Sequence, residues 1–374
     1  MKFILLTIFV FATNFIRAQY FQFTYQGKVR TYLAHWPAQI STKEKIPLIL
    51  ALHGGGGNAF TMESISGLSQ KADSSHFLVV YPEGTHKDGL AFRTWNAGWC
   101  CGYAANNQID DVGFIDTLIH ILKQQFTIDE NRIYVTGMSN GGFMAYRIAC
   151  ELSSKIAAIA PVAATMTLSD CEPTRGVSII HFHSYLDTHV PYYGGIGSGL
   201  SHHYNPPLDS VLNAWSFHDS CLVNRDTLTN NEKFTLIRWG HCHCNREILY
   251  YITHDGGHSW PGNPDGGSQY LNATDLMWEF FKNHPLLCDS ASYINQESFF
   301  ADKPFVSPNP FHSTFIIKPY DPSQKVSFEI YDLSGRKIIQ LPNKPIQTPQ
   351  IPKGFYLLKV TSGKQRYFIK IVKL

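Results

Sequence analysis

The sequence predicts an α/β protein: a mostly parallel sheet with helices on both faces, followed by a small C-terminal all-β sandwich module. Between about residues 20 and 285, apolar runs typical of buried strands alternate with segments whose apolar residues recur at helical spacing. After about residue 288, short alternating stretches lie between turn-forming residues, without a helical period. The length of 374 residues accommodates one large domain and one small domain.

Six short apolar runs predict the strands of the sheet. They are rich in β-branched and aromatic residues and lie at 46–52, 77–81, 132–136, 157–162, 177–182 and 248–253. Three segments with helical spacing predict helices that cover it, at 110–126, 142–152 and 273–282. Hydrophobic residues make up 44% of the chain, which is enough for a packed core.

The first 18 residues have the organisation of a signal peptide. Lys2 precedes an apolar run at 3–12, and Ala18 is a plausible cleavage point before Gln19. A lone membrane anchor is the alternative interpretation, but the run is short for a membrane span. We therefore expect a secreted chain, or one attached to the outer surface after cleavage.

The balance of charge excludes some partners. The formal net charge is +2 and charged residues are only 16%, so electrostatics give no case for binding nucleic acid or an acidic membrane surface. Few charges combined with 19 Tyr and 25 Phe fit a secreted protein that handles neutral polymers.

The eight cysteines are an even number in an exported chain, which favours disulfides over reduced thiols. Many pairings are possible. We expect one bridge from Cys100 or Cys101 to Cys150, and one from Cys221 to Cys242 or Cys244. The alternative for residues 241–244, His-Cys-His-Cys, is a metal cluster. Alternation along a strand would send His and Cys to opposite faces, so we expect no metal and no other cofactor.

Residues 137–141 read Gly-Met-Ser-Asn-Gly, a Gly-x-Ser-x-Gly pattern that chance alone can supply. Its context is more specific, because a predicted strand precedes it and a predicted helix follows. That is the setting of the nucleophile elbow of α/β-hydrolases, with Ser139 as nucleophile. The glycines leave room for a tight turn that holds the serine in a strained conformation. The alternative role of Ser139 is an ordinary helix cap.

A serine nucleophile needs a general base, and the base needs an orienting acid. In this fold the chain order is serine, acid, histidine. Asp187 and His258 each follow a predicted strand, at the edge where such sheets place their sites, so we assign Asp187 as orienter and His258 as base. The competing residues are Asp170, Asp255, His181, His183, His189 and His254.

The glycine run at 53–58 follows the predicted strand 46–52. Backbone amides there can turn toward the nucleophile, and we expect those of Gly55 and Asn140 to form the oxyanion hole. A phosphate loop would need Lys-Ser/Thr after the glycines, which this chain lacks. His53, Trp95 and Trp260 are candidates for substrate contact, although a core position is equally consistent with each tryptophan.

Six segments together resemble the polyhydroxybutyrate depolymerase-like esterase family, which overlaps the feruloyl and acetylxylan esterases of carbohydrate esterase family 1. They lie at 53–57, 95–101, 110–115, 137–142, 187–192 and 257–262. The resemblance implies that Ser139, Asp187 and His258 form a triad that hydrolyses carboxylic esters of polymeric or plant cell-wall substrates. The family usually carries His-Gly-Thr shortly before the aspartate. Here residues 184–186 are Ser-Tyr-Leu, a bulkier loop that is expected to alter the pocket.

The C-terminal module resembles the type A sorting domain of the type IX secretion system. The resemblance rests on Ser-Pro-Asn-Pro-Phe at 307–311, on residues 330–336 and on Gly-Phe-Tyr-Leu at 354–357. It implies an outer-membrane export signal, with the secretion machinery as partner. A carbohydrate-binding β-sandwich is the alternative, but the module has no Trp for stacking on sugars.

The predicted organisation is a signal peptide at 1–18, an esterase domain at 19–285, a linker at 286–303 and a sorting domain at 304–374. We expect a monomer. Three other functions stay open at this point: a serine peptidase on the same fold, a non-catalytic surface-binding protein, and a metal-dependent hydrolase using residues 241–244.

Overall fold

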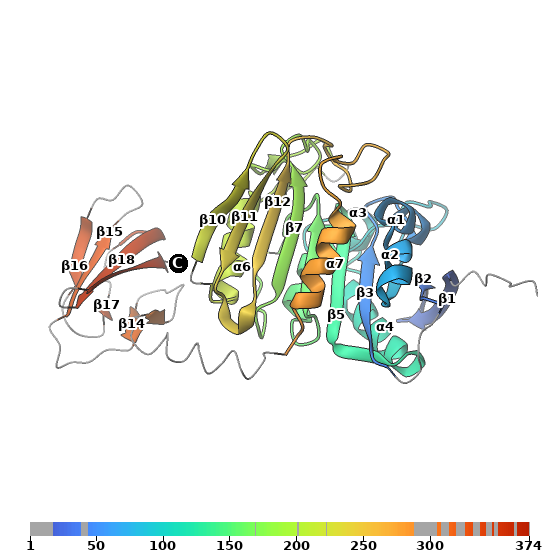
Figure 1. Ribbon diagram of the computed structural model, residues 1–374, viewed down its shortest axis with the longest axis horizontal. Coiled ribbons are helices and arrows are strands. Elements are labelled where there is room, and N and C mark those ends of the chain that lie inside the picture. Colours follow the sequence, from blue (N-terminus) through green and yellow to red (C-terminus); the bar gives the residue numbers. More distant parts are fainter. Residues whose placement is uncertain are drawn as a thin grey trace, which may run out of the picture. The chain divides into compact units, whose positions relative to one another are not determined.

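The computed structural model divides into two compact units, Met1–Cys288 and Asp289–Leu374, called here the larger unit and the C-terminal unit (Figure 1). In the larger unit it describes residues 18–38, 44–168, 170–199, 202–221 and 223–287. In the C-terminal unit it describes residues 305–307, 314–318, 326–331, 337–341, 346–347, 351–362 and 365–373. The expected signal peptide therefore falls almost entirely outside the described residues. The division lies within residues 286–303, where the sequence predicts a linker.

The larger unit is built on a ten-stranded sheet in the order β1-β2-β4-β3-β5-β6-β7-β12-β11-β10. The neighbours from β4 to β12 are parallel, whereas both ends of the sheet are antiparallel. The strands are β1 (Ala18–Tyr25), β2 (Lys28–His35), β3 (Ile46–Leu52), β4 (Leu78–Pro82), β5 (Ile128–Met138), β6 (Ala158–Val162), β7 (Ser178–Ser184), β10 (Val223–Asn230), β11 (Phe234–Gly240) and β12 (Ile248–Thr253).

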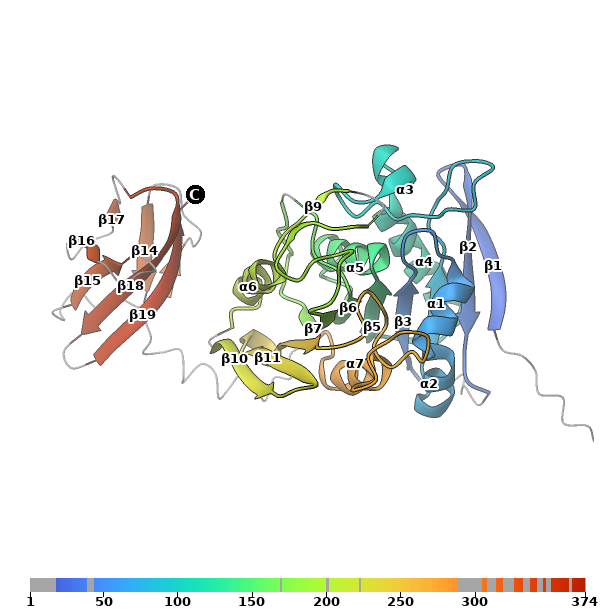
Figure 2. The ribbon, with the colours of Figure 1, turned by 90° about the horizontal axis from the view of Figure 1, so that it is seen from above.

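Helices cover both faces of this sheet, so the predicted fold class is confirmed (Figure 2). One face packs on α4 (Asp111–Gln125), α5 (Asn140–Glu151) and α6 (Leu208–His218). The other face packs on α1 (Ala59–Ser66), α2 (Leu68–Ser75) and α7 (Ala273–Asn283). Short elements complete the unit: α3 (Gly102–Asn106), β8 (Gly195–Ile196), β9 (Tyr204–Asn205) and the 3-10 turn His243–Asn245.

Local signals fix where these helices begin. The side chain of Asp110 accepts a hydrogen bond from the Gly113 amide at 2.9 Å, which satisfies a free donor in the first turn of α4. Asn272 caps α7 in the same way, through the amide of Asp275 at 3.0 Å. The predicted helices at 110–126 and 273–282 thus start close to where the structure starts them.

The central strands are buried along their whole length, whereas the outer strands are not. All seven residues of β3 are buried, but β1 alternates between exposed and half-buried positions. A parallel strand covered on both faces must be continuously apolar, which makes it easy to recognise in a sequence. β1, β2, β10 and β11 lack that signal and were not predicted.

Three disulfides are described: Cys100–Cys101, Cys150–Cys171 and Cys221–Cys242. The expected bridge from Cys221 to Cys242 is confirmed, but the one from Cys100 or Cys101 to Cys150 is wrong. Cys100 lies beside Asn140 at the start of α5, whereas Cys150 is in its last turn. Ten helical residues separate those ends by roughly 15 Å, too far for a bridge.

The same disulfides remove the metal alternative for residues 241–244. Cys242 is bonded to Cys221, so its sulfur cannot serve as a thiolate ligand. The alternative of a metal-dependent hydrolase that uses this stretch is therefore not supported.

The C-terminal unit contains a four-stranded antiparallel sheet, β16-β15-β18-β19, and a three-stranded one, β13-β14-β17. Its strands are β13 (Phe305–Ser307), β14 (Thr314–Lys318), β15 (Val326–Tyr331), β16 (Lys337–Leu341), β17 (Ile346–Gln347), β18 (Gly354–Ser362) and β19 (Gln365–Lys373). Alternate residues of β15 and β18, among them Phe328, Ile330 and Leu358, contribute to its core together with Val306 and Ile371. This is the all-β module that the alternating stretches predicted.

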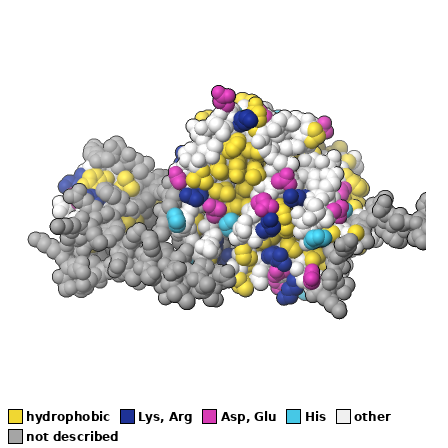
Figure 3. All heavy atoms as spheres, in the orientation of Figure 1, with side chains coloured by type: hydrophobic (Ala, Val, Ile, Leu, Met, Phe, Trp, Pro, Cys, Tyr) yellow, Lys and Arg dark blue, Asp and Glu magenta, His cyan; other side chains and the backbone are white. Residues whose placement is uncertain are grey.

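The surface of the larger unit agrees with the modest net charge of the chain. Figure 3 shows basic and acidic side chains interspersed over one face, around a group of hydrophobic side chains. Among the described residues, none of the helices combines the length and the apolar character that crossing a membrane would require.

Candidate active site

Ser139 lies at the turn between β5 and α5, in the middle of the sheet. Its φ of 54° and ψ of −124° place it in a region that residues with a side chain rarely adopt. The turn is this tight because backbone passes on both sides. A Cβ added to Gly141 would collide with the carbonyl oxygen of Leu52, and one added to Gly137 would lie 2.5 Å from the backbone of Gly141. The two glycines of the pattern are thus required by packing.

Asp187 and His258 come together at the same edge of the sheet. Asp187 follows the end of β7 and His258 follows the end of β12, and these two strands are parallel neighbours. The Nδ1 of His258 donates to the Oδ2 of Asp187 at 2.8 Å. The other carboxylate oxygen, Oδ1, accepts from the amides of His189 and Val190, both at 2.9 Å.

Electrostatics keep Asp187 ionised. Burial of the carboxyl would raise its pKa, but the hydrogen bond from His258, together with the neighbouring His183 and the Val190 amide, outweighs it and lowers the pKa. A carboxylate can only accept, so Nδ1 of His258 carries the proton of that hydrogen bond. The Nε2 of the neutral ring is left as the basic nitrogen.

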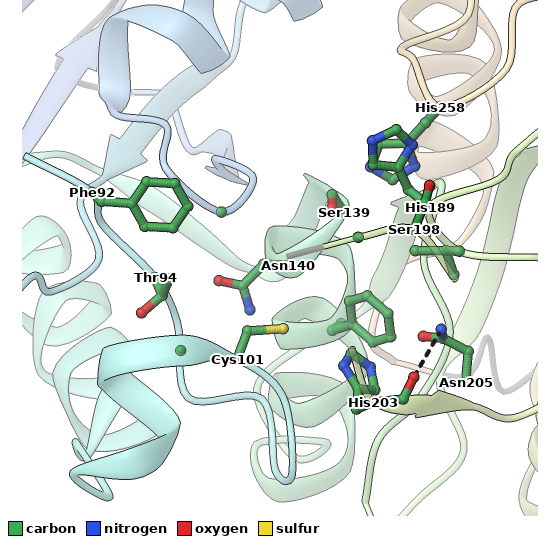
Figure 4. A pocket seen from close by; sticks show the side chains of 15 residues that line it. Phe92, Thr94, Cys101, Ser139, Asn140, His189, Ser198, His203, Asn205 and His258 are labelled. Carbon is green, nitrogen blue, oxygen red and sulfur yellow. Dashed lines mark hydrogen bonds between the residues drawn. The ribbon is translucent and has the colours of Figure 1, made fainter. Parts of the chain in front are cut away.

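The predicted residues meet at a cavity of about 400 Å³. Ser139, Asn140 and His258 line it (Figure 4). Gly55 is also part of its lining. Gly55 brings the glycine loop close to the start of α5, because a Cβ added there would lie 3.9 Å from that of Asn140. Residues far apart in the chain therefore line this one cavity, called the chamber below. Its volume is within the size range of small-molecule sites.

Asn140 is held in place through its side chain. Its Oδ1 accepts from the amide of Trp95 at 2.7 Å, and its Nδ2 donates to the Trp95 carbonyl at 3.0 Å. As the first residue of α5, it has a backbone N–H without an acceptor inside the helix. That N–H and the positive end of the helix dipole are suited to a developing negative charge.

The substrate contacts expected of His53, Trp95 and Trp260 stay predictions, and none of the three is among the residues that line this cavity. The Nε2 of His53 accepts from the Gly84 amide at 3.0 Å and its Nδ1 lies 2.7 Å from the Gly54 carbonyl. Burial lowers the pKa of this histidine to about 4, so the ring stays neutral. His53 is a support for the glycine loop.

Both tryptophans are likewise in the core. The indole N–H of Trp95 donates to the His53 carbonyl at 3.0 Å, and that of Trp260 donates to the Oγ1 of Thr274 at 3.0 Å. Each ring is buried, and each indole N–H already has an acceptor within the fold. This is the core position that the sequence left open for each of them.

Sequence reasoning missed much of the cavity wall. The further lining residues come mainly from two loop regions and include Phe92, Ser198, His203 and Asn205, whereas Phe143 belongs to α5. His189, considered only as a competing base, stacks its ring on that of His258 with centroids 4.7 Å apart. No periodicity marks such loop residues, so only the fold reveals that they face the chamber.

Two groups of side chains could be considered as metal ligands among the described residues: Asp187 with His189 and His258, and Cys100 and Cys101 with His203. Both cysteines of the second group are joined in a disulfide. In the first, each oxygen of Asp187 already accepts a hydrogen bond. A metal there would have to break contacts that orient the carboxylate.

Residues 31–172 match the family model described as esterase PHB depolymerase. The larger unit carries an esterase PHB depolymerase domain. By this relationship the esterase domain is a carboxylic ester hydrolase.

The esterase domain is similar to three curated proteins. The bifunctional acetylxylan esterase/xylanase XynS20E of Neocallimastix patriciarum is 28% identical over 245 residues, which are 64% of this chain and 32% of that protein. Feruloyl esterase B of Piromyces equi is 30% identical over 172 residues, with coverages of 45% and 31%. Feruloyl esterase C of Emericella nidulans is 26% identical over 259 residues, with coverages of 67% and 83%. The chain thus spans about a third of the first two proteins and most of the third.

Among solved structures, an acetyl xylan esterase from Aspergillus awamori is similar over 71% of this chain and 99% of its own chain, at 12% identity and a TM-score of 0.49.

The C-terminal unit has a family match of its own. Residues 306–374 match the secretion system C-terminal sorting domain. The esterase domain is therefore secreted, to the cell surface or the extracellular space.

Proposed function

We propose that the esterase domain is a serine esterase in which Ser139 is the nucleophile, His258 the general base and Asp187 the residue that orients it. The observation that carries this proposal is the 2.8 Å hydrogen bond between His258 and Asp187, beside a chamber that His258 and Ser139 both line. The strained turn at Ser139 and the hydrogen bond that holds the Asn140 side chain to the Trp95 backbone support it.

The reaction follows from these positions. Nε2 of His258 takes the proton of Ser139 Oγ as this oxygen attacks the ester carbonyl. The backbone amides of Asn140 and Gly55 stabilise the oxyanion of the tetrahedral intermediate. His258 then returns the proton to the leaving alcohol, and an acyl-enzyme forms on Ser139. A water molecule, deprotonated by His258, releases the acid and restores the enzyme.

For the substrate, we propose feruloyl esters of plant cell-wall polysaccharides. Three curated relatives are named as feruloyl or acetylxylan esterases. The chamber of about 400 Å³ is large for an acetyl group alone, and Phe92 and Phe143 provide apolar wall for an aromatic acyl group. Acetylated xylan and polyhydroxybutyrate are the competing substrates of the same chemistry.

A panel assay distinguishes these substrates. We expect kcat/KM for methyl ferulate to exceed that for methyl acetate by roughly ten- to a hundredfold, since an aromatic acyl group buries far more apolar surface in the chamber. Acetylated xylan and short-chain polyhydroxybutyrate complete the panel. Faster release of acetate than of ferulate at equal ester concentration would contradict the assignment, while leaving the serine mechanism intact.

The partners of the whole chain follow from its two units. We expect the C-terminal unit to engage the type IX secretion machinery during export, and the esterase domain to act as a monomer. Light scattering on the purified chain tests the second point, because a dimer would double the mass of 42.3 kDa.

A further inference from the structure

Behind Asp187, away from the chamber, three buried polar side chains play no part in the proposed reaction. They are Tyr146 on α5 and His181 and His183 on β7, and each has an exposed fraction of 2% or less. The two histidines are two residues apart on a strand, so both point to the same face of the sheet. Their rings stack with centroids 5.6 Å apart and an interplanar angle of 15°.

Hydrogen bonds connect these side chains in a line that leads to the loop of Asp187. The hydroxyl of Tyr146 lies 2.8 Å from Nδ1 of His181, and Nε2 of His181 lies 3.3 Å from Nδ1 of His183. Nε2 of His183 lies 2.8 Å from the carbonyl oxygen of Val190 and 3.4 Å from Oδ2 of Asp187. All four nitrogens of the two rings thus have a partner.

The contact between Nε2 of His183 and the carbonyl oxygen of Val190 fixes the position of every proton in the line. A carbonyl oxygen can only accept, so Nε2 of His183 carries a hydrogen. In a neutral ring the other nitrogen, Nδ1, is then an acceptor, and Nε2 of His181 must donate to it. By the same argument Nδ1 of His181 accepts, and the donor is the hydroxyl of Tyr146. Every donor therefore points toward Asp187.

The buried surroundings of His181 and His183 also favour neutral imidazole rings. Burial lowers the pKa of His181 well below its ordinary value, and the neighbouring His183 lowers it further. Burial likewise lowers the pKa of His183, despite the opposing charge of Asp187. A proton added to either Nδ1 would also remove an acceptor from the line and leave a buried donor facing a donor.

On the basis of the proposed function, we propose that Tyr146, His181 and His183 are positioning residues for the carboxylate of Asp187. His183 acts at two points. Its Nε2–H approaches Oδ2 directly, and it also fixes Val190, whose own amide donates to Oδ1 at 2.9 Å. Aligned hydrogen bonds polarise one another, so the line presents the positive end of its dipoles to the carboxylate that orients His258.

The structure offers a matched control for the alternative, in which these residues only fill the core. Tyr250 on β12 packs edge-on against the ring of His181, with centroids 5.4 Å apart. It is fully buried, and its hydroxyl has no hydrogen-bond partner among the described residues. Tyr250→Phe therefore removes a buried hydroxyl from a tyrosine whose ring packs on the same imidazole, and it breaks none of the hydrogen bonds of the line.

Kinetics separate the two roles. For Tyr146→Phe we expect kcat on a p-nitrophenyl ester to fall on the order of 3- to 10-fold with KM nearly unchanged, because the orienting acid is loosened and the chamber is not. Tyr250→Phe should leave both constants within about twofold. Equal kinetic effects of the two variants, or a change in KM alone, would overturn the proposal.

Because His183→Leu is at risk of not folding, it is paired with His183→Gln, whose side-chain amide can still donate to the Val190 carbonyl. We expect the glutamine variant to regain part of the kcat that the leucine variant loses. If both variants fold and lose the same activity, the donor to Val190 has no positioning role.

Nuclear magnetic resonance of the full chain with ¹⁵N-labelled histidine tests the line without relying on turnover. We expect His181 and His183 to be neutral with the hydrogen on Nε2, and the Nδ1–H resonance of His258 to shift in Tyr146→Phe but not in Tyr250→Phe. An Nδ1–H tautomer, a charged ring, or an unmoved His258 resonance would refute it. An inactive wild-type protein would refute the proposed function while this spectroscopic result still decided the inference.

Discussion

The Ser139→Ala variant is expected to hydrolyse a short p-nitrophenyl ester roughly three to six orders of magnitude more slowly than the wild-type chain. The methyl side chain cannot attack the ester, whereas the oxyanion donors and the binding chamber stay in place. Residual turnover above the uncatalysed rate should therefore persist. Steady-state kinetics on folded protein, with its concentration determined from absorbance, measure this change.

Covalent labelling tests directly whether Ser139 is the nucleophile. A fluorophosphonate should modify the wild-type chain at Ser139 and leave Ser139→Ala unlabelled. Ser74 is exposed on α2, and among the described residues its hydroxyl bonds only to the backbone of its own helix, so Ser74→Ala is the matched control and should retain full labelling and turnover. Unchanged turnover in Ser139→Ala would remove Ser139 from the mechanism.

The second large effect concerns stability and its dependence on pH. Asp219, at the end of α6, is fully buried, and neither of its carboxylate oxygens has a hydrogen bond of good geometry among the described residues. Burial raises the pKa of this carboxyl to about 8, although Arg246, the Val177 amide and Arg175 oppose the rise. The folded protein thus favours the protonated, neutral form of Asp219.

The sign of the effect follows from linkage. In the unfolded chain the carboxyl has its ordinary pKa near 4, so below that pH both states hold the proton and no penalty arises. As the pH rises from about 4 to about 8, the folded state retains a proton that the unfolded state has released, and the free energy of unfolding falls. Asp219 therefore costs stability at neutral and alkaline pH.

We expect Asp219→Asn to raise the free energy of unfolding at pH 8 by on the order of 2–4 kcal/mol, and to change it little at pH 4. Urea unfolding of both proteins at several pH values measures the difference. Asp265→Asn, at an exposed position, is the control and should follow the wild-type curve at every pH. Parallel curves for wild type and Asp219→Asn would show that the buried carboxyl is ionised in the fold.

The sequence predicted the site where chemistry leaves a signature in residue types and order. A strand, a Gly-x-Ser-x-Gly turn and a helix are contiguous in the chain, so Ser139 could be placed at its turn from the sequence alone. Asp187 and His258 were reached through the strands that precede them, because parallel strands end at one edge of the sheet. The structure brings these two side chains into contact, as the chain order suggested.

Other features were harder to predict, because a residue type does not reveal which way its side chain faces. His53 and Trp95 lie in segments next to the chamber, but their polar atoms are bonded to backbone and their rings are buried. The pairing of Cys150 depended on distance along α5, which separates it from Cys100 and leaves Cys171 as its partner. Both outcomes follow from three-dimensional packing, which leaves no local pattern in the chain.

By itself, the sequence determined the two-part architecture and the turn at Ser139, and it led to Asp187 and His258 as the proposed acid and base. These features depend on local periodicity, on tight turns that need glycine, and on the order of residues along the chain. Only the tertiary structure decided the wall of the chamber, the disulfide partners and the line from Tyr146 to Asp187. Each of these depends on contacts between segments distant in the chain, where packing and the burial of polar groups select the partners.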